Sequence, residues 1–477
     1  MAENLKQSVV SGVKWLAFSK LLIQLFRWGS TFWVIRMLDS HDYGVMAIAE
    51  ILGALLVSIN FLCIGNTIIR FRAISTSLLN TLFLMCCVIA VTLFLFQYSM
   101  ADWFSQFYKT PEAADVLKLI AIAYLLECFS VQPMALLAKK MEFKQLAKID
   151  MTAGIAMPVS VLVCAYAGMG YWSLAVGHIV NALVKALMSN YLHPIKYGFS
   201  TRFKRVLPML KFGMQNTGAS IMAQINNSID FIVGGQVFST SQIGSYQVGL
   251  QVSYIPLRKI SPELRRIAFP AFSKVNKEKE KVVAYYFKSS KLISVLVFPL
   301  FWGLGLMAER IVEVVLTSKW SSAAAVIQVI CFALPFKLLT EKTGAMVNAL
   351  GRADILLVNT TFATVSFLLM LPFTLELGIA GLAYAWLVSI MLTYFLLVYR
   401  VCRILPMNML QVASNYRVAI LASIMMGIAV HLFGLYVMEH NVLNMLIQIA
   451  LGALAYGVTI FILSRSILAE FKQLIKG

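Results

Sequence analysis

Two segments of membrane-spanning length carry matching lines of polar residues at helical spacing, 200 positions apart. The residues are Lys20, Gln24, Arg27 and Ser30 in the first segment, and Ser220, Gln224, Asn227 and Asp230 in the second. At about 100° per residue, each set falls on one face of a helix. Charges and amides are costly inside a bilayer, so such a face is expected to line a wet cavity or contact a partner. The recurrence predicts a duplicated transporter with a polar seam between its halves.

The two cations of the first segment predict an anion-binding face. Lys20 and Arg27 are seven positions apart with Gln24 between them, and a guanidinium binds phosphate oxygens through two parallel hydrogen bonds. A phosphate or an acidic sugar fits this face. The alternative is that both cations pair within the protein, for example with Glu50 or Asp230, or snorkel to the interface. We predict a substrate cavity lined by Lys20, Gln24, Arg27, Gln224, Asn227 and Asp230.

Other ionisable residues within the predicted spans suggest ion coupling. Glu50, Glu127 and Asp230 are candidates for binding a proton or sodium ion, with structural ion pairing as the alternative. Lys185 either lines the inner mouth or snorkels. Lys337 and Glu341 are spaced i, i+4, which favours a pair on one helix.

A basic cluster is expected at the cytoplasmic mouth of the cavity. It consists of Arg258, Lys259, Arg265 and Arg266. These side chains either capture a diphosphate before entry or anchor the protein to the anionic inner leaflet.

The composition places the chain in the membrane. Of its 477 residues, 60% are hydrophobic and 13% are charged, more apolar surface than a soluble protein can bury. A span needs about 20 residues. The sequence predicts fourteen, with twelve as the alternative because prolines and arginines crowd the span at 244–268. They lie near 12–37, 44–68, 78–97, 115–138, 149–168, 172–192, 206–235, 244–268, 287–307, 323–348, 355–376, 379–401, 415–435 and 442–465.

The net charge of +19 indicates topology rather than nucleic-acid binding. Its basic residues gather in alternate connectors, for example 139–148 and 196–211, while the other connectors are poor in Lys and Arg. The positive-inside rule then places both termini in the cytoplasm. No cleaved signal peptide is expected, and the seven cysteines show neither metal-ligand spacing nor an exposed disulfide pair.

A weak internal repeat accompanies the polar lines. Asp39-Ser40 followed by Gly44 matches Ser239-Thr240 followed by Gly244, and the stretch from Gly168 matches the one from Gly378. Six spans separate the members of each match, so the halves keep the same orientation. We predict an all-α integral membrane protein with a six-helix lobe at 1–200 and another at 201–405. The lobes surround a central cavity, and 406–477 add two transmembrane helices and a cytoplasmic tail.

Signals of catalysis are missing from the sequence. There is no phosphate-binding glycine loop, paired-histidine motif or Gly-x-Ser-x-Gly elbow. We therefore expect no catalytic residues, metal or cofactor. A membrane glycosyltransferase or polymerase would usually need a sizeable external loop or an acidic cluster, and neither is found.

Several stretches, taken in order, resemble one family of membrane proteins. They are Ser11-Gly-Val-Lys-Trp15, Asp39-Ser-His-Asp-Tyr-Gly44, Gly65-Asn-Thr-Ile-Ile69, Gln132-Pro, Lys140-Met-Glu-Phe143, Gly170-Tyr-Trp-Ser-Leu174, Phe269-Pro-Ala-Phe-Ser273 and Ala349-Leu-Gly-Arg-Ala353. The set is similar to the Wzx-type polysaccharide-transporter flippases, nearest to their colanic-acid exporter branch. These belong to the multidrug/oligosaccharidyl-lipid/polysaccharide exporter superfamily. The resemblance covers nearly the whole chain, but it identifies no site residue.

The resemblance implies a flippase of the bacterial cytoplasmic (inner) membrane that works by alternating access. Its substrate would be an undecaprenyl-diphosphate-linked oligosaccharide, moved outward for lipopolysaccharide or exopolysaccharide synthesis. Membrane lipids, a polysaccharide polymerase and assembly proteins are the expected partners, and nucleic acid is not. The alternatives are an ion-coupled multidrug exporter of the same fold and a scaffold for polysaccharide assembly that does not transport.

Overall fold

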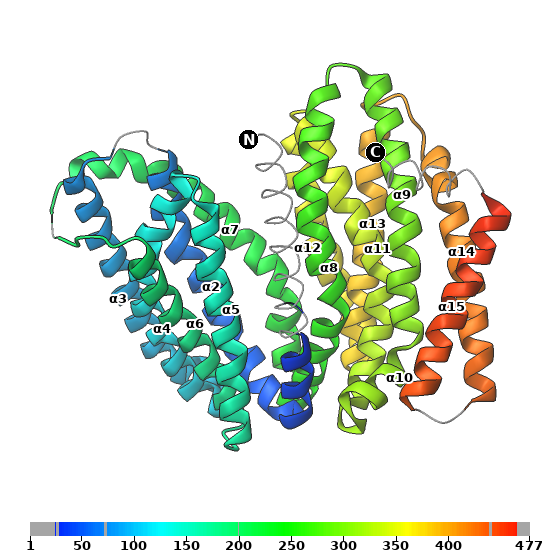
Figure 1. Ribbon diagram of the computed structural model, residues 1–477, viewed down its shortest axis with the longest axis horizontal. Helices are drawn as coiled ribbons and strands as arrows, with labels where there is room; N and C mark the ends of the chain where they lie inside the picture. Colours follow the sequence, from blue (N-terminus) through cyan, green and yellow to red (C-terminus); the bar gives the residue numbers. More distant parts are fainter. Residues whose placement is uncertain (1–23, 25–27, 71–73, 199, 438–440, 465–477) are drawn as a thin grey trace, which may run out of the picture. The chain divides into compact units, whose positions relative to one another are not determined.

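The structure, a computed structural model, is built from long helices joined by short connectors (Figure 1). It describes residues 24, 28–70, 74–198, 200–437 and 441–464, and no strand occurs among them. Ten of the described helices are long and apolar enough to cross a membrane. The predicted class, an all-α multi-pass membrane protein, is confirmed, whereas the count of fourteen spans is not.

The chain divides into two compact units, one up to Gly244 and one from Ser245. The predicted lobes at 1–200 and 201–405, the extra helices at 406–477 and the central cavity stay predictions. The first predicted span, 12–37, lies mostly outside the described residues, and its end at 28–37 is helical. The other helices of the first unit are α2 (Ser40–Arg70), α3 (Thr76–Phe107), α4 (Glu112–Lys139), α5 (Phe143–Tyr166), α6 (Trp172–Leu192) and α7 (Phe203–Val237).

The second unit begins within α8, which is continuous from Thr240 to Val275 despite three internal prolines. The span at 244–268, the least certain in the sequence, is therefore helical throughout. The remaining long helices are α9 (Lys279–Leu306), α11 (Ser321–Ala349), α12 (Ala353–Thr374), α13 (Ile379–Cys402), α14 (Met409–Tyr436) and α15 (Val442–Leu463). A short α10 (Ala308–Ile311) and single turns connect α9 to α11.

Polar residues mark where several helices begin. The Ser75 side chain accepts a hydrogen bond from the Leu78 amide at the start of α3. Asn408 and Gln411 form a reciprocal capping box at the start of α14, and Asn441 caps α15. These contacts satisfy amide groups that the first turn of a helix leaves without a partner.

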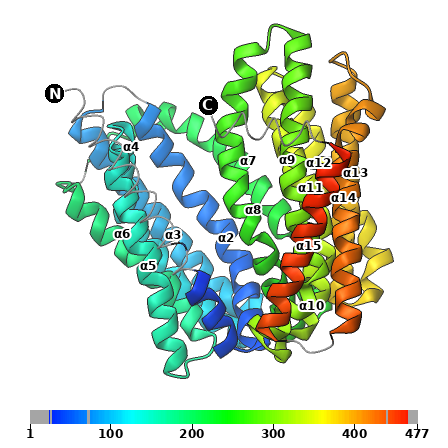
Figure 2. The same cartoon turned by 45° about the vertical axis from the view of Figure 1, so that its right-hand side comes forward.

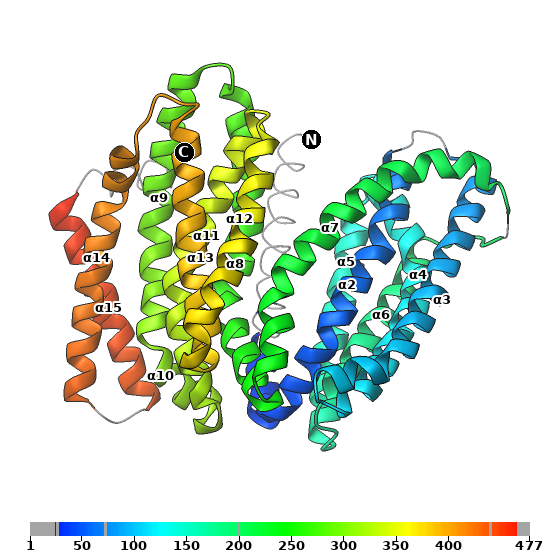
Figure 3. The same cartoon turned by 180° about the vertical axis from the view of Figure 1, so that it is seen from behind.

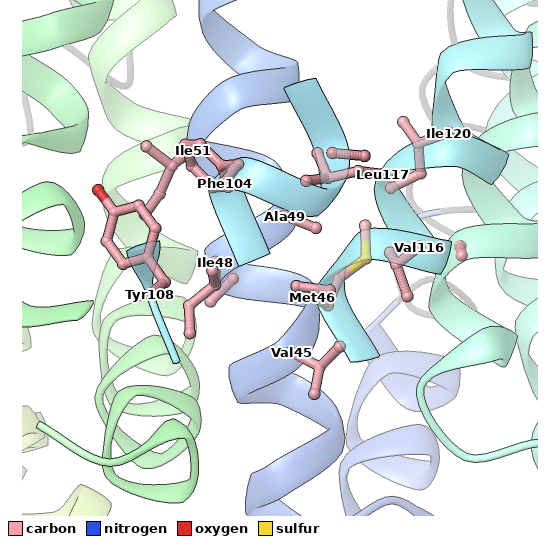
Figure 4. Packing of buried hydrophobic residues seen from close by; sticks show 14 of the residues in the cluster. Val45, Met46, Ile48, Ala49, Ile51, Phe104, Tyr108, Val116, Leu117 and Ile120 are labelled. Atoms are coloured by element: carbon pink, nitrogen blue, oxygen red, sulfur yellow. The ribbon is translucent and has the colours of Figure 1, made fainter. Parts of the chain in front are cut away.

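Helix α4 is central to the first unit. It packs against α2, α3 and α6, while α5 lies on α6 and α7 lies along α2 (Figure 3). Apolar side chains of α2, α3 and α4 form one buried cluster (Figure 4), with Ile48, Phe104 and Leu117 among its members. Apolar groups of neighbouring helices thus fill the interior of the unit, and polar groups there must find partners within it.

Helix α11 has the corresponding role in the second unit. It packs against α9 and α13, and α12 lies beside α13. Helices α14 and α15 form a hairpin against α9 (Figure 2). Most apolar side chains of α15 remain exposed, as expected for a helix that faces lipid.

Backbone conformation supports the predicted duplication. The described non-helical positions with positive φ include three pairs: Lys109 and Thr317, Met141 and Gly351, and Gly168 and Gly378. Members of the last two pairs are 210 positions apart and follow corresponding helices. The α4–α5 and α11–α12 connectors, and the α5–α6 and α12–α13 connectors, therefore each have a residue with positive φ at the matched position.

A reciprocal backbone contact joins two matched segments within the first unit. A Cβ atom added to Gly44 would lie 1.9 Å from the backbone oxygen of Thr240. One added to Gly244 would lie 1.7 Å from the backbone oxygen of Ser40. The repeated glycine therefore has a steric reason, because only glycine permits the starts of α2 and α8 to approach so closely.

We expect Gly44→Ala and Gly244→Ala each to lower the free energy of unfolding by about 1–3 kcal/mol, because the backbones must separate. Gly53→Ala is the matched control within α2, since a Cβ there meets nothing within 4 Å. Thermal unfolding of the purified protein in detergent measures the effect. Equal midpoints for all three variants would contradict the close contact.

Candidate functional site

The first predicted polar line is only partly described. Lys20 and Arg27 lie outside the described residues, while Gln24 is helical and half-buried. Their proposed contact with substrate stays a prediction.

The second polar line divides between buried and exposed positions on α7. Gln224 donates a hydrogen bond to the Ser228 hydroxyl over 2.9 Å. Asn227 is exposed, whereas Asp230 is 3% exposed and accepts from the Phe231 amide over 3.0 Å. Asn227 is thus the member of this line that a ligand reaches most readily.

A cluster of ionisable groups joins α2, α4 and α6. Glu50 of α2 forms an ion pair with His178 of α6, with 3.2 Å between Oε1 and Nε2. Glu127 of α4 lies near them, and the charges of Lys185 and His178 act on its carboxylate. Its buried Oε2 has no hydrogen-bond partner among the described residues. Two carboxylates and an imidazole therefore share one polar region inside the unit.

The sequence identified Glu50 and Glu127 as candidates but not His178. One signal was available, because His178 and Lys185 are seven positions apart and so share a face of α6. The spacing does not show that this face of α6 lies near Glu50 of α2 and Glu127 of α4, because that depends on how the helices pack.

The predicted cytoplasmic-mouth residues divide between two faces of α8. Arg258 and Arg265 are seven positions apart and share the face that contacts α11, whereas Lys259 and Arg266 point elsewhere by helical geometry. All four are exposed. Arg266 pairs with Glu263 of its own helix over 3.0 Å.

A line of polar contacts connects α8 to α11. The Lys337 ammonium lies 5.1 Å from the centre of the Tyr254 ring. Glu341 accepts a short hydrogen bond from the Ser261 hydroxyl and faces the Arg265 guanidinium at 3.8 Å. We call these five residues the α8–α11 line.

The expected pair of Lys337 and Glu341 on one helix is wrong. Within the described residues each finds its partner on α8 instead, Lys337 at Tyr254 and Glu341 at Ser261 and Arg265. The i, i+4 rule describes an isolated helix, and here a neighbouring helix offers both side chains other partners.

Lys342, next in sequence, is a buried cation that the sequence analysis missed. It is 1% exposed, and its ammonium contacts the Tyr286 carbonyl oxygen at 3.2 Å and the Ser290 hydroxyl. The face of the Tyr286 ring lies 3.6 Å from it. No carboxylate of the described residues forms an ion pair with it. Carbonyl, hydroxyl and ring face together match the three donors of an ammonium group.

Gln132 of the first unit makes a contact like that of Lys342. It is 1% exposed on α4 and donates to the Leu79 carbonyl of α3 over 2.6 Å, just as Lys342 of α11 donates to a carbonyl of α9. Gln132 and Lys342 are 210 positions apart. In both units, a buried side chain of the central helix thus donates a hydrogen bond to a carbonyl of a neighbouring helix. The donor is a neutral amide in the first unit and a cation in the second.

Arg310 of α10 is a second buried cation in this unit. It donates to Gln448 Oε1 and to the Val437 carbonyl, both over 2.7 Å. These contacts fix the α14–α15 hairpin to the connector after α9. In the described part of the chain, no group of three or more His, Cys, Asp or Glu side chains is placed to hold a metal ion.

Two solved structures share the fold. The lipid II flippase MurJ, in an inward closed conformation, matches with a TM-score of 0.75 at 15% identity, covering 95% of this chain and 98% of that chain. An inward-facing multidrug resistance MATE family transporter of the MOP superfamily matches with a TM-score of 0.62 at 13% identity, covering 83% and 95%. The chain is therefore a helical membrane protein with a MurJ/MATE-like fold.

Sequence comparison gives the family. Residues 34–325 match the family described as "Polysaccharide biosynthesis protein", and the chain belongs to it. It is 25% identical to the lipopolysaccharide biosynthesis protein WzxC of Escherichia coli (strain K12), over 76% of this chain and 75% of that protein. It is 24% identical to a membrane protein of the cps region of Klebsiella pneumoniae, over 99% of both. The resemblance expected from the sequence motifs is confirmed.

Gln132 suggests a test of the role of Lys342. We expect Lys342→Gln to unfold at the same temperature as wild type or higher, because an amide can still donate to a carbonyl while a buried charge is removed. Lys342→Ala should lower the free energy of unfolding by about 2–4 kcal/mol, through the cavity and the lost donor. Thermal unfolding in detergent compares them. A glutamine variant as unstable as the alanine variant would show that the fold needs the charge.

Proposed function

We propose that the protein is a flippase for undecaprenyl-diphosphate-linked oligosaccharides. It moves them across the bacterial cytoplasmic membrane by alternating access, for surface polysaccharide biosynthesis. One combined observation carries the proposal. A member of the polysaccharide biosynthesis family has, along 95% of its length, the fold of a lipid II flippase.

The chemistry of the substrate assigns roles to the predicted residues. The lipid tail can remain in the bilayer, so the diphosphate is the part that most needs compensating charge. Arg27 and Lys20 offset that cost within the cavity, and Arg258 and Arg265 receive the diphosphate at the mouth. Gln224, Asn227 and Asp230 offer hydrogen bonds to sugar hydroxyl groups.

The cluster around Glu127 supports proton coupling. The Glu127 carboxylate has a buried oxygen without a hydrogen-bond partner among the described residues, and it lies near a histidine that is already paired with Glu50. A proton bound at Glu127 removes a charge that the apolar surroundings disfavour. Asp230 is the remaining candidate, since it is buried on α7.

The proposed function also bears on catalysis, topology and partners. The protein acts as a transporter rather than an enzyme, without a cofactor, and both termini lie in the cytoplasm, as the basic connectors predict. A polysaccharide polymerase and assembly proteins would receive or supply its substrate.

A second candidate function is ion-coupled export of small molecules, favoured by the match to a MATE family transporter. The cations at the α8–α11 line argue against cationic drugs as substrates. In a scaffold without transport, the Glu50–His178 pair would serve only the stability of the fold, and no proton coupling would be needed.

Cells lacking the protein test the function directly. We expect the lipid-linked repeat unit to accumulate on the inner leaflet, because its synthesis continues while its exit is blocked. Wild-type protein should reverse this. Arg27→Ala and Lys20→Ala at equal expression should restore export about 10- to 100-fold less well, the loss of a charge-assisted contact. Leaflet-specific labelling of extracted lipids measures it. Unchanged lipids in the deletion strain would contradict the flippase, and intact export by both variants would contradict only the roles of these two cations.

Proton coupling predicts a specific defect in reconstituted vesicles. An imposed pH gradient should accelerate translocation of a fluorescent lipid-linked saccharide by the wild-type protein. Glu127→Gln should abolish that acceleration, because an amide cannot take up the proton. Glu112→Gln is the matched control, since Glu112 lies in the first turn of α4 with its side chain 40% exposed and only a surface contact to His41. A Glu127→Gln protein that still responds fully to the gradient would contradict coupling at this site.

A further inference from the structure

The face of α8 that meets α11 carries more cations than its neighbour neutralises. Tyr254, Arg258, Ser261 and Arg265 lie within an arc of roughly 60° on α8. Glu341 is the carboxylate of α11 that meets this arc. Arg258, in the middle of the arc, is exposed and forms no hydrogen bond or ion pair with any described residue.

The Glu341–Arg265 contact has the geometry of a replaceable pair. The 3.8 Å between the two groups exceeds the length of a charge-assisted hydrogen bond, about 2.7–2.9 Å. The Arg265 side chain is 60% exposed, while that of Glu341 is 20% exposed and held by Ser261. Exposed ion pairs contribute little to stability. A stronger anion can therefore displace the carboxylate from the arginine without disturbing the helix that carries it.

We propose that Glu341 is a built-in competitor for a diphosphate at Arg265. The identity of the ligand as a diphosphate rests on the proposed flippase function. A diphosphate carries more charge than one carboxylate and can accept two parallel hydrogen bonds from Arg265. Arg258 is two turns away, about 10 Å along the axis, and its long side chain can reach the second phosphate.

This arrangement gives the site a means of release. While the diphosphate is bound, Glu341 keeps its hydrogen bond to Ser261 and its negative charge repels the ligand. When the ligand leaves, Glu341 returns to Arg265 and neutralises it. The carboxylate thus weakens binding and restores the empty site, as a carrier that must let go of its substrate requires.

Binding measurements on the full-length protein test the competitor. The protein is placed in nanodiscs of phosphatidylcholine, with and without phosphatidylglycerol, and titrated with undecaprenyl diphosphate. We expect Glu341→Gln to bind about 3- to 5-fold more tightly than wild type, the scale of an exposed ion pair. Glu263→Gln, which removes the same charge beside Arg266, is the matched control and should leave the affinity unchanged.

A double variant connects the effect to one arginine. Arg265→Gln should weaken binding, and Glu341→Gln added to it should have no further effect, because the pair is already broken. Thermal unfolding midpoints close to that of wild type would show that the variants remain folded.

Four outcomes would overturn the proposal. The first two are an equal increase in affinity for Glu341→Gln and Glu263→Gln, and an unchanged affinity for Glu341→Gln. The third is full additivity of the two substitutions in the double variant. The fourth is an increase in affinity only in nanodiscs that contain phosphatidylglycerol, which would identify a phospholipid headgroup as the ligand instead. All four leave the flippase function standing, because that function is judged by the lipid intermediate in cells. A fifth outcome, absence of undecaprenyl diphosphate binding in both wild type and Glu341→Gln, would also overturn the proposal.

Discussion

An ionised side chain inside a membrane protein must find a partner or reach water, and this constraint organises the polar interior of both units. In the first unit, Glu50 meets His178 across two helices. In the second, Arg310 is satisfied by an amide and a carbonyl oxygen, and Lys342 by a carbonyl, a hydroxyl and a ring face. Most partners come from another helix, so the charges also determine which helix faces meet.

The positions of the helices could be predicted from the sequence, whereas the partners of the charges could not. Apolar run length and alternating basic connectors place α2 to α9 and α11 to α15 within about ten residues of their observed bounds. Pairing is a property of packed faces, so the predicted Lys337–Glu341 pair is replaced by contacts to α8. The sequence does not distinguish Lys342 either, because only the packing of α11 against α9 brings it to the Tyr286 carbonyl and the Ser290 hydroxyl.

Polar groups and glycines recur at matched positions, as the predicted duplication leads one to expect. The Gly44 and Gly244 contacts are reciprocal, and Gln132 and Lys342 each donate to a carbonyl of a neighbouring helix. In each unit, therefore, the backbones at matched places need the same close approach or the same hydrogen-bond donor. The sequence repeat was weak because steric and hydrogen-bonding needs fix only a few positions, while lipid-facing residues can exchange freely among apolar types.

The differences between the matched positions carry the functional meaning. Glu127 on α4 corresponds to Lys337 on α11, and the neutral Gln132 corresponds to Lys342, so the central helix of the second unit has gained positive charge at both places. In the first unit, the buried Glu127 carboxylate lies near a histidine that already pairs with Glu50, which suits reversible protonation. In the second unit, the exposed Arg258 and Arg265 of α8 suit an anionic ligand. These differences at equivalent positions support the proposals of ion coupling in the first unit and of a diphosphate contact at α8 in the second.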